Sequence, residues 1–309
     1  MTQTHPAQPQ YSPSTDEVLM AAVAHGSVFL SIFGPIGPIL VWISQRRKSA
    51  YASFHALQAL GYQMAFYWVG IAAALILVIG WGSMVLPDVS AALQENPQEL
   101  MSVLEDEGFI TLVTVFTWGI FVAGGVLGAL MCWLKKDFRY PWLGRRLETF
   151  LKFDANSGKL DVEAEERFIA SMAHASAILF LTGMLTPIAV WVTQKSTSTY
   201  LRFQALQAAV YQALALVGYF FFLLAYAALF IFLGLLFIPA SAQSEAFTIA
   251  MLVLILVILL VLIAGMLALP TYHLFAMIAG IQILKGRDYH YPVLGAYLAR
   301  RIQPKTLKG

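Results

Sequence analysis

Uninterrupted apolar runs set the strongest limit on how this chain folds. Residues 250–269, for example, contain no charged side chain. A helix needs about 20 such residues to cross the hydrocarbon core of a bilayer, and this run lacks the alternation of an outer-membrane barrel strand. Because 59% of the residues are hydrophobic and only 12% are charged, the sequence predicts an all-α polytopic membrane protein instead of a soluble domain.

The sequence also repeats itself. Residues from His25 onward recur 149 positions later, and residues near the end of the unit recur 151 positions later. The recurring pairs include His25 with His174, Gln58 with Gln207, Tyr62 with Tyr211, and Tyr140 with Tyr291. Such constant spacing over more than a hundred residues indicates one module used twice. We expect a disordered tail at 1–17, a first membrane repeat at 18–151, a polar linker at 152–165, a second membrane repeat at 166–303 and a tail at 304–309.

Each repeat is predicted to contain three apolar segments. The first segment of the first copy, residues 18–44, is interrupted by Gly34, Pro35 and Pro38, which a straight helix does not tolerate. Two transmembrane helices and a terminal amphipathic helix on the membrane surface then follow. In the first copy we expect them at 50–86, 109–134 and 140–150, with an acidic loop at 87–107 that is either solvated or binds cations or a partner. In the second copy, Pro270 is expected to kink the last long helix, at 247–284.

The distribution of basic residues bears on the threading. All 19 Lys and Arg lie at 46–48, at 135–167, at 195 and 202, and from 285 onward. If every segment crossed fully, these residues would be divided between the two faces, and the positive-inside rule would favour neither orientation. If each Pro-broken segment is re-entrant, all of them lie on one face. We favour the re-entrant threading, which places the chain in the cell inner membrane with both termini in the cytoplasm.

Two histidines occupy equivalent positions in apolar surroundings. An ionisable group there is costly and suggests a functional site. His25 and His174 would form a proton relay or metal site if His55 joined them. The alternative, which we favour, is that each neutral imidazole binds a carbonyl freed by the proline break. No carboxylate or cysteine accompanies the histidines at metal-ligand spacing, so we expect no metal and no cofactor.

A polar stripe follows the histidines on the next helix. His55, Gln58 and Tyr62 share one helix face, and Gln207 and Tyr211 repeat it in the second copy. These side chains either line a hydrophilic path between the copies or tie neighbouring helices together by hydrogen bonds. The predicted polar path consists of His25, His174, His55, Gln58, Gln207, Tyr62 and Tyr211.

Other residues are expected to have structural or lipid-binding roles. The single cysteine, Cys132, excludes an intrachain disulfide and is predicted to fill the core. Gly125 and Ala129 form a small-residue face where helices can approach closely. Five arginines are expected to contact anionic lipid headgroups: Arg139, Arg145, Arg146, Arg300 and Arg301.

Several motifs of the chain resemble a known family. They are Ala24-His25, Trp42 before basic residues, the box from Phe54 to Ala59, and the terminal Phe138-Arg139-Tyr140-Pro141. These motifs resemble the bacterial membrane domain related to the chloroplast inner-envelope import component Tic-twenty. The resemblance implies a multi-pass helical module that serves in a channel, in transport or in assembly. The second copy departs from the box, with Gln204 in place of its histidine.

Two functions follow from these observations. The chain is either a channel, transport or translocation-associated component with a polar path, or a structural or partner-binding subunit of a membrane complex. We expect no enzyme, because we find no nucleophile or paired carboxylates that form a catalytic site. The expected partners are the lipid bilayer with its anionic headgroups and a membrane-protein partner or a second copy of the chain, and no nucleic acid.

Overall fold

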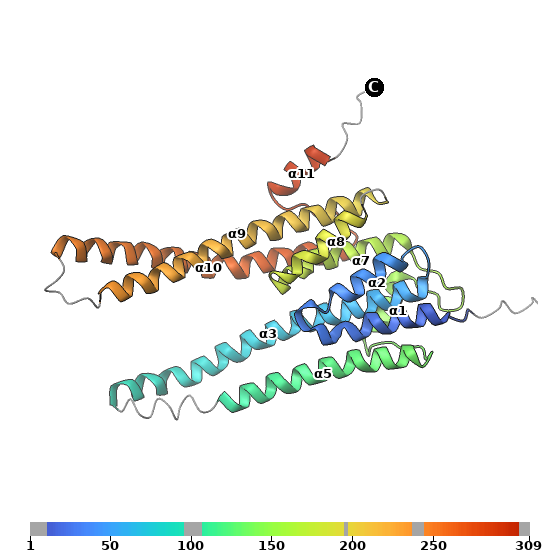
Figure 1. The fold of residues 1–309 in the computed structure, drawn as a ribbon, viewed down its shortest axis with the longest axis horizontal. Coiled ribbons are helices and arrows are strands. Elements are labelled where there is room, and N and C mark those ends of the chain that lie inside the picture. Colours follow the sequence, from blue (N-terminus) through green and yellow to red (C-terminus); the bar gives the residue numbers. More distant parts are fainter. Residues whose placement is uncertain (1–10, 96–106, 195–196, 237–243, 303–309) are drawn as a thin grey trace, which may run out of the picture. The chain divides into compact units, whose positions relative to one another are not determined.

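The computed structural model describes residues 11–95, 107–194, 197–236 and 244–302, which form helices and no strand. The protein has an all-α polytopic membrane fold, as the sequence predicted. The chain divides into two compact units, residues 1–168 and 169–309. Each unit contains one copy of the repeat, so the duplication seen in the sequence is also a duplication of structure (Figure 1).

The first unit begins with a helical hairpin. Its elements are α1 (Thr15–Gly26), the 3₁₀ helix η1 (Ser27–Phe33) and α2 (Ile36–Gln45). Ser14 caps α1 in a capping box with Glu17. At the turn, Ser27 Oγ donates a hydrogen bond to the carbonyl of Gly34, at 3.0 Å. A Cβ on Gly37 would collide with Ser27, so the two arms need glycine to approach this closely.

The hairpin returns to the end from which it starts. The ring of Tyr11, just before α1, lies 6.5 Å from the ring of Tyr51, which follows α2. At 1.5 Å per residue, α1 is about 18 Å long and α2 is about 15 Å long, and each is shorter than the roughly 30 Å hydrocarbon core. Two short helices that return to one end are compatible with the re-entrant threading, which stays a prediction.

Two long helices complete the first unit. They are α3 (Ala50–Glu95) and α5 (Glu107–Trp133), followed by the short α6 (Leu143–Leu151). Helix α1 packs against both α3 and α5. A Cβ on Gly125 would lie 3.1 Å from the carbonyl oxygen of His25, so the predicted small-residue face is where α5 meets α1. In α6, Leu147 and Leu151 are buried while Arg145 and Arg146 are exposed, which confirms an amphipathic helix.

The second unit repeats this order of elements. Helix α7 (Val162–Ala175) crosses the boundary between the units and is followed by η2 (Ser176–Leu179), η3 (Thr182–Met184), α8 (Leu185–Thr193), α9 (Thr199–Leu236), α10 (Glu245–Leu284) and α11 (Leu294–Ile302). Helices α9 and α10 run antiparallel, since Tyr211 near the start of α9 bonds Tyr272 near the end of α10. Pro270 lies inside α10, as the sequence indicated.

The two units turn at matching residues. Positive φ angles occur at Ser31 and Phe180, at 51° and 54°, and at Trp142 and Val293, at 62° and 65°. A positive φ is unfavourable for residues with a side chain, most of all for β-branched ones such as valine. Its recurrence at equivalent positions shows that the tertiary structure of the repeat holds these turns in place.

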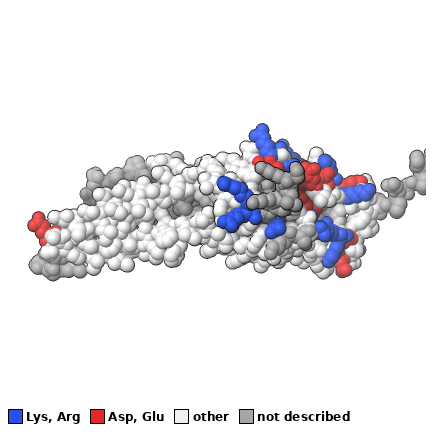
Figure 2. Space-filling view, turned by 90° about the horizontal axis from the view of Figure 1, so that it is seen from above, with Lys and Arg blue, Asp and Glu red and all other residues white. Residues whose placement is uncertain are grey.

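The long helices are apolar along their length. Figure 2 shows long stretches of this face in white, without Lys, Arg, Asp or Glu. Five helical segments of the described residues are long and apolar enough to cross a membrane: Thr15–Phe33, Ala50–Leu77, Thr111–Trp133, Thr199–Leu235 and Glu245–Leu284. The first of these contains the arm and turn of the hairpin, so its length alone does not make it a crossing.

Two helices, α1 and α3, have boundaries that differ clearly from the sequence prediction. Helix α1 begins at Thr15 instead of Val18, and Tyr11 is held by a bond from its amide to the carbonyl of Asn156, at 3.2 Å. Helix α3 continues through Pro87 to Glu95, because a proline removes only one backbone donor from a long hydrogen-bonded helix. The rest of the predicted acidic loop, 96–106, and the tail at 1–10 lie outside the described residues.

Candidate functional site

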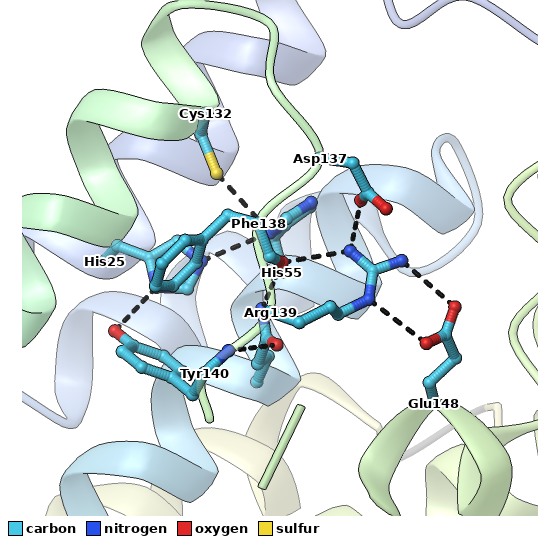
Figure 3. A network of polar contacts seen from close by, with 9 residues as sticks. His25, His55, Cys132, Asp137, Phe138, Arg139, Tyr140 and Glu148 are labelled. Carbon is cyan, nitrogen blue, oxygen red and sulfur yellow. Dashed lines mark hydrogen bonds and ion pairs between the residues drawn. The ribbon is translucent and has the colours of Figure 1, made fainter. Parts of the chain in front are cut away.

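Each repeat encloses a cluster of residues where its first helix meets a non-helical segment near its end. We call this the Tyr-Pro segment; it consists of residues 138–141 in repeat one and 289–292 in repeat two. The repeat-one cluster consists of His25, His55, Gln58, Phe138 and Tyr140, and the repeat-two cluster of His174, Gln204, Gln207, Tyr289 and Tyr291. Figure 3 shows His25, His55, Phe138 and Tyr140 of the repeat-one cluster, together with Cys132 and with Arg139 and its acidic partners Asp137 and Glu148. All the members taken from helices are buried, among hydrophobic side chains.

A glutamine holds the Tyr-Pro segment in both repeats. Gln58 Nε2 donates to the carbonyl of Phe138 and Gln58 Oε1 accepts from the amide of Tyr140, both at 3.2 Å. Gln207 makes the same two bonds to Tyr289 and Tyr291, both at 3.0 Å. These backbone groups lie outside any helix, so the side-chain amide supplies the partners that a buried backbone requires.

The tyrosine that follows joins the other helices. The hydroxyl of Tyr140 lies 2.9 Å from His25 Nδ1, and the hydroxyl of Tyr291 lies 3.0 Å from His174 Nδ1. Burial raises the pKa of Tyr140 well above its ordinary value, so its hydroxyl stays protonated. The two histidines thus bind tyrosine hydroxyls, and the prediction that they bind freed backbone carbonyls was wrong. The Tyr-Pro segment folds back over the first helix, so its tyrosine hydroxyl takes the place at the histidine that we expected a backbone carbonyl to take.

The stripe tyrosines stack on the same segment. The rings of Tyr62 and Tyr140 lie 3.9 Å apart, and those of Tyr211 and Tyr291 lie 3.8 Å apart, each pair inclined by only 5°. The Tyr62 hydroxyl donates to the carbonyl of Phe121 at 2.9 Å. In each repeat this stacking and bonding fasten the long helices to the Tyr-Pro segment.

The two clusters differ at one edge. In repeat one, His25 Nε2 lies 3.2 Å from His55 Nδ1, and Cys132 Sγ lies 3.4 Å from the same nitrogen. In repeat two, His174 Nε2 instead lies 3.1 Å from Gln204 Oε1. An amide oxygen only accepts, so His174 carries its proton on Nε2 and accepts from Tyr291 at Nδ1. The second cluster is therefore a fully assigned hydrogen-bond network, whereas the first contains two imidazoles and a thiol.

Arg139 binds the protein instead of facing lipid. Its guanidinium pairs with Asp137 and with Glu148, the latter at 3.2 Å, and its carbon lies 4.5 Å from the ring centre of Phe54. The side chain is only 13% exposed. The prediction that Arg139 contacts lipid headgroups was therefore wrong, because local acidic groups and an aromatic face already surround its charge.

The other predicted headgroup contacts are exposed. Arg145, Arg146, Arg300 and Arg301 all lie at the surface of the short terminal helices. Arg146 lies over the ring of Trp142, 4.2 Å from its centre, and Arg301 lies 5.5 Å from the ring centre of Tyr297. An arginine beside an aromatic ring at a helix surface suits the boundary between water and lipid, and contact of these four residues with headgroups stays a prediction.

The predicted polar path consists of buried and half-buried residues. His25, His174, His55, Gln58 and Gln207 are buried, and Tyr62 and Tyr211 are half-buried. Their hydrogen bonds described above all join groups of one repeat. This placement suits the packing alternative better than a hydrated path.

Sequence reasoning missed two features of this region. One is the bond from Trp42 Nε1 to the buried carboxylate of Glu165, at 2.6 Å, for which the sequence offered no signal because 123 positions separate the two residues. The other is the central place of Tyr140 and Tyr291. The two tyrosines recur at a spacing of 151 positions. We used this recurrence as evidence for the repeat and did not infer from it that the tyrosines lie in the core of each repeat.

The comparison with protein families identifies one match. The chain matches the magnetosome magnetite crystal formation protein family over residues 16–147 and again over residues 165–298. This finding corrects the resemblance to the Tic-twenty-related family, whose shared motifs were too short to distinguish it from another duplicated membrane module. Neither the curated proteins nor the solved structures gave a match.

Proposed function

Because the chain belongs to the magnetosome magnetite crystal formation protein family, we propose that it resides in the magnetosome membrane and supports crystal formation as a structural, partner-binding component. The observation that carries this proposal is the internal bonding of the two clusters. Gln58 and Gln207 lie at the centre of the predicted path. In each of them the side-chain amide nitrogen donates to the Tyr-Pro segment and the amide oxygen accepts from it. The proposal includes no catalytic step.

A structural role also agrees with the cost of opening such a cluster. Each buried backbone group left without its partner costs about 1–3 kcal/mol. A conducting path through the clusters would have to break several of these bonds in each repeat. The clusters therefore favour a rigid module over a gated one.

A combined experiment separates the structural role from the transport role. In a magnetosome-forming host, we expect the tagged chain to co-purify with magnetosomes and its deletion to alter the size or shape of the magnetite crystals. Proteoliposomes that contain the purified chain should take up Fe²⁺ no faster than protein-free vesicles, with an ionophore as the positive control. Uptake of Fe²⁺ that depends on the chain would establish the transport role instead.

The proposal includes a threading. We propose that the basic ends of both repeats and both termini face the cytoplasm, with each hairpin re-entrant. The support is the hairpin geometry of Tyr11 and Tyr51 and the positive-inside rule. In a Cys132→Ser background, Arg47→Cys and Thr199→Cys should react with a membrane-impermeant maleimide from the cytoplasmic side, and Ser244→Cys from the opposite side. Labelling of Thr199→Cys and Ser244→Cys from one side would overturn this threading.

A further inference from the structure

Three potential metal ligands converge inside the first repeat. They are His25 Nε2 in the last turn of α1, His55 Nδ1 in the second turn of α3 and Cys132 Sγ near the end of α5. The three ligand atoms lie within 4.8 Å of one another, and all three side chains are fully buried. Figure 3 shows the two rings and the thiol facing one another. A sequence reading that assigned Cys132 to core filling did not foresee this.

The spacing fits a three-coordinate ion. Metal–nitrogen bonds of about 2.0 Å and metal–sulfur bonds of about 2.3 Å place trigonal ligands about 3.5 Å (N to N) and about 3.7 Å (N to S) apart. The observed separations are 3.2 Å between the two imidazole nitrogens and 3.4 Å between the thiol and His55 Nδ1. These two pairs need to open by only a few tenths of an ångström. The third pair, His25 Nε2 and Cys132 Sγ, lies within 4.8 Å and has to close by about 1 Å at most, which side-chain rotations provide.

Hydrogen bonding alone does not satisfy this group. His55 Nδ1 has either one proton or one lone pair, yet both His25 and Cys132 approach it. A metal ion at the centre would use the lone pairs of both imidazoles at once. The Tyr140 hydroxyl would then accept the Nδ1 proton of His25 and orient its ring, the usual outer partner of a ligating histidine.

The second repeat is an internal comparison. It keeps the histidine and the tyrosine but has Gln204 where repeat one has His55, and Ile283 where repeat one has Cys132. Its cluster is complete with hydrogen bonds alone. Packing of the module therefore requires neither the second imidazole nor the thiol.

Charge selects the ion. The site offers one thiol, which becomes an anion when it releases its proton to solvent on binding, and two neutral imidazoles. Only a monovalent cation then leaves the buried site without net charge, and a buried net charge is costly. Thiolate and imidazole are ligands of Cu(I).

We propose that His25, His55 and Cys132 form a buried three-coordinate site for one Cu(I) ion in the first repeat. Binding forms one sulfur–metal bond and two nitrogen–metal bonds, releases the thiol proton and changes no oxidation state. The site does not depend on the structural function proposed above, since it requires only the folded first repeat.

Titration of the full chain in detergent tests the site. Cu(I), supplied under a reductant both during expression and after purification, should bind at one ion per chain in competition with a colorimetric Cu(I) chelator. His55→Gln and Cys132→Ile, which install the residues of repeat two, should each weaken binding at least 100-fold, with circular dichroism confirming that the variants are folded. His174→Gln is the matched control and should leave the affinity unchanged.

Three results would overturn the proposal. The first is no binding at one ion per chain by the wild type under either mode of supply. The second is equal affinity in the wild type and the two variants, which would place the ion elsewhere. The third is Zn²⁺ binding at this site that is tighter than Cu(I) binding, which would refute the charge argument.

Discussion

The indole nitrogen of Trp42 donates a 2.6 Å hydrogen bond to the carboxylate of Glu165, although 123 positions separate the two residues. Both side chains are buried, at the end of α2 and the start of α7. Beside them, Arg46 pairs with Glu166 at 3.0 Å. The start of α7 is thus bonded to α2 through the indole of Trp42 and through the ion pair of Arg46.

Glu165 is expected to make the stability of the protein depend on pH. Burial raises its pKa to about 7, from an ordinary value of 4.5. A folded-state pKa above the unfolded one means that this group's contribution is fully present below pH 4.5 and is lost as pH rises through about 7. The melting temperature in detergent should therefore fall across this window, by an amount that corresponds to a free energy on the order of 3 kcal/mol.

Glu165→Gln should flatten that slope, because the amide oxygen still accepts from Trp42 and carries no proton to lose. Glu163→Gln is the matched control on the same helix and should retain the wild-type slope, since its side chain is 77% exposed. A slope that is the same in Glu165→Gln and the wild type would assign the effect to another group.

Gln58 is expected to be a stability residue. Gln58→Leu leaves the Tyr140 amide without its partner, at a cost of about 1–3 kcal/mol, while the Phe138 carbonyl keeps the bond that Arg139 donates to it. Gln207→Leu should have a similar effect in the second repeat, because it removes the partner of the Tyr291 amide while Gln204 still donates to the Tyr289 carbonyl. Thermal melts of the purified variants measure both effects, and Gln282→Leu, which removes only an exposed bond to Arg287, is the control. A melting temperature of Gln58→Leu equal to that of the wild type would contradict the proposal that Gln58 holds the Tyr-Pro segment in place.

Gly128 is expected to tolerate no side chain. A Cβ there would lie 2.9 Å from the Phe138 ring and 3.0 Å from His25 Nδ1, so Gly128→Ala should destabilise the protein by about 1–3 kcal/mol through overpacking. The counterpart in repeat two is Ala279, which is already an alanine. Ala279→Gly should therefore change the melting temperature much less, and equal losses in both variants would show that the two clusters are packed alike.

The exposed arginines are expected to hold anionic lipid. Arg145→Gln/Arg146→Gln should lower the amount of anionic lipid that co-purifies with the protein. Each arginine removed should weaken the binding free energy of the lipid by roughly 1 kcal/mol. Arg139→Gln should instead lower the melting temperature without lipid loss, because Arg139 is bound by Glu148 and by Asp137. Native mass spectrometry counts the bound lipids, and lipid loss in Arg139→Gln alone would reverse the assignment.

The prediction from sequence was most reliable where local pattern decides structure. The length of the apolar runs identified α9 and α10, and the glycine and proline interruption near Pro38 identified the hairpin. The family, by contrast, was misassigned from short motifs. The C-terminal end of α3 was predicted too early, just before Pro87. The helix continues to Glu95, because a proline inside a long helix removes only one backbone donor.

The sequence by itself determined that this protein is helical, that it lies in a membrane and that it is built as one module used twice, because hydrophobic runs and constant spacing are properties of the chain alone. Only the tertiary structure decided which polar groups meet. His25 reaches His55, Cys132 and Tyr140 from three different elements. That meeting depends on how α1, α3, α5 and the Tyr-Pro segment pack together, which periodicity along one helix does not encode.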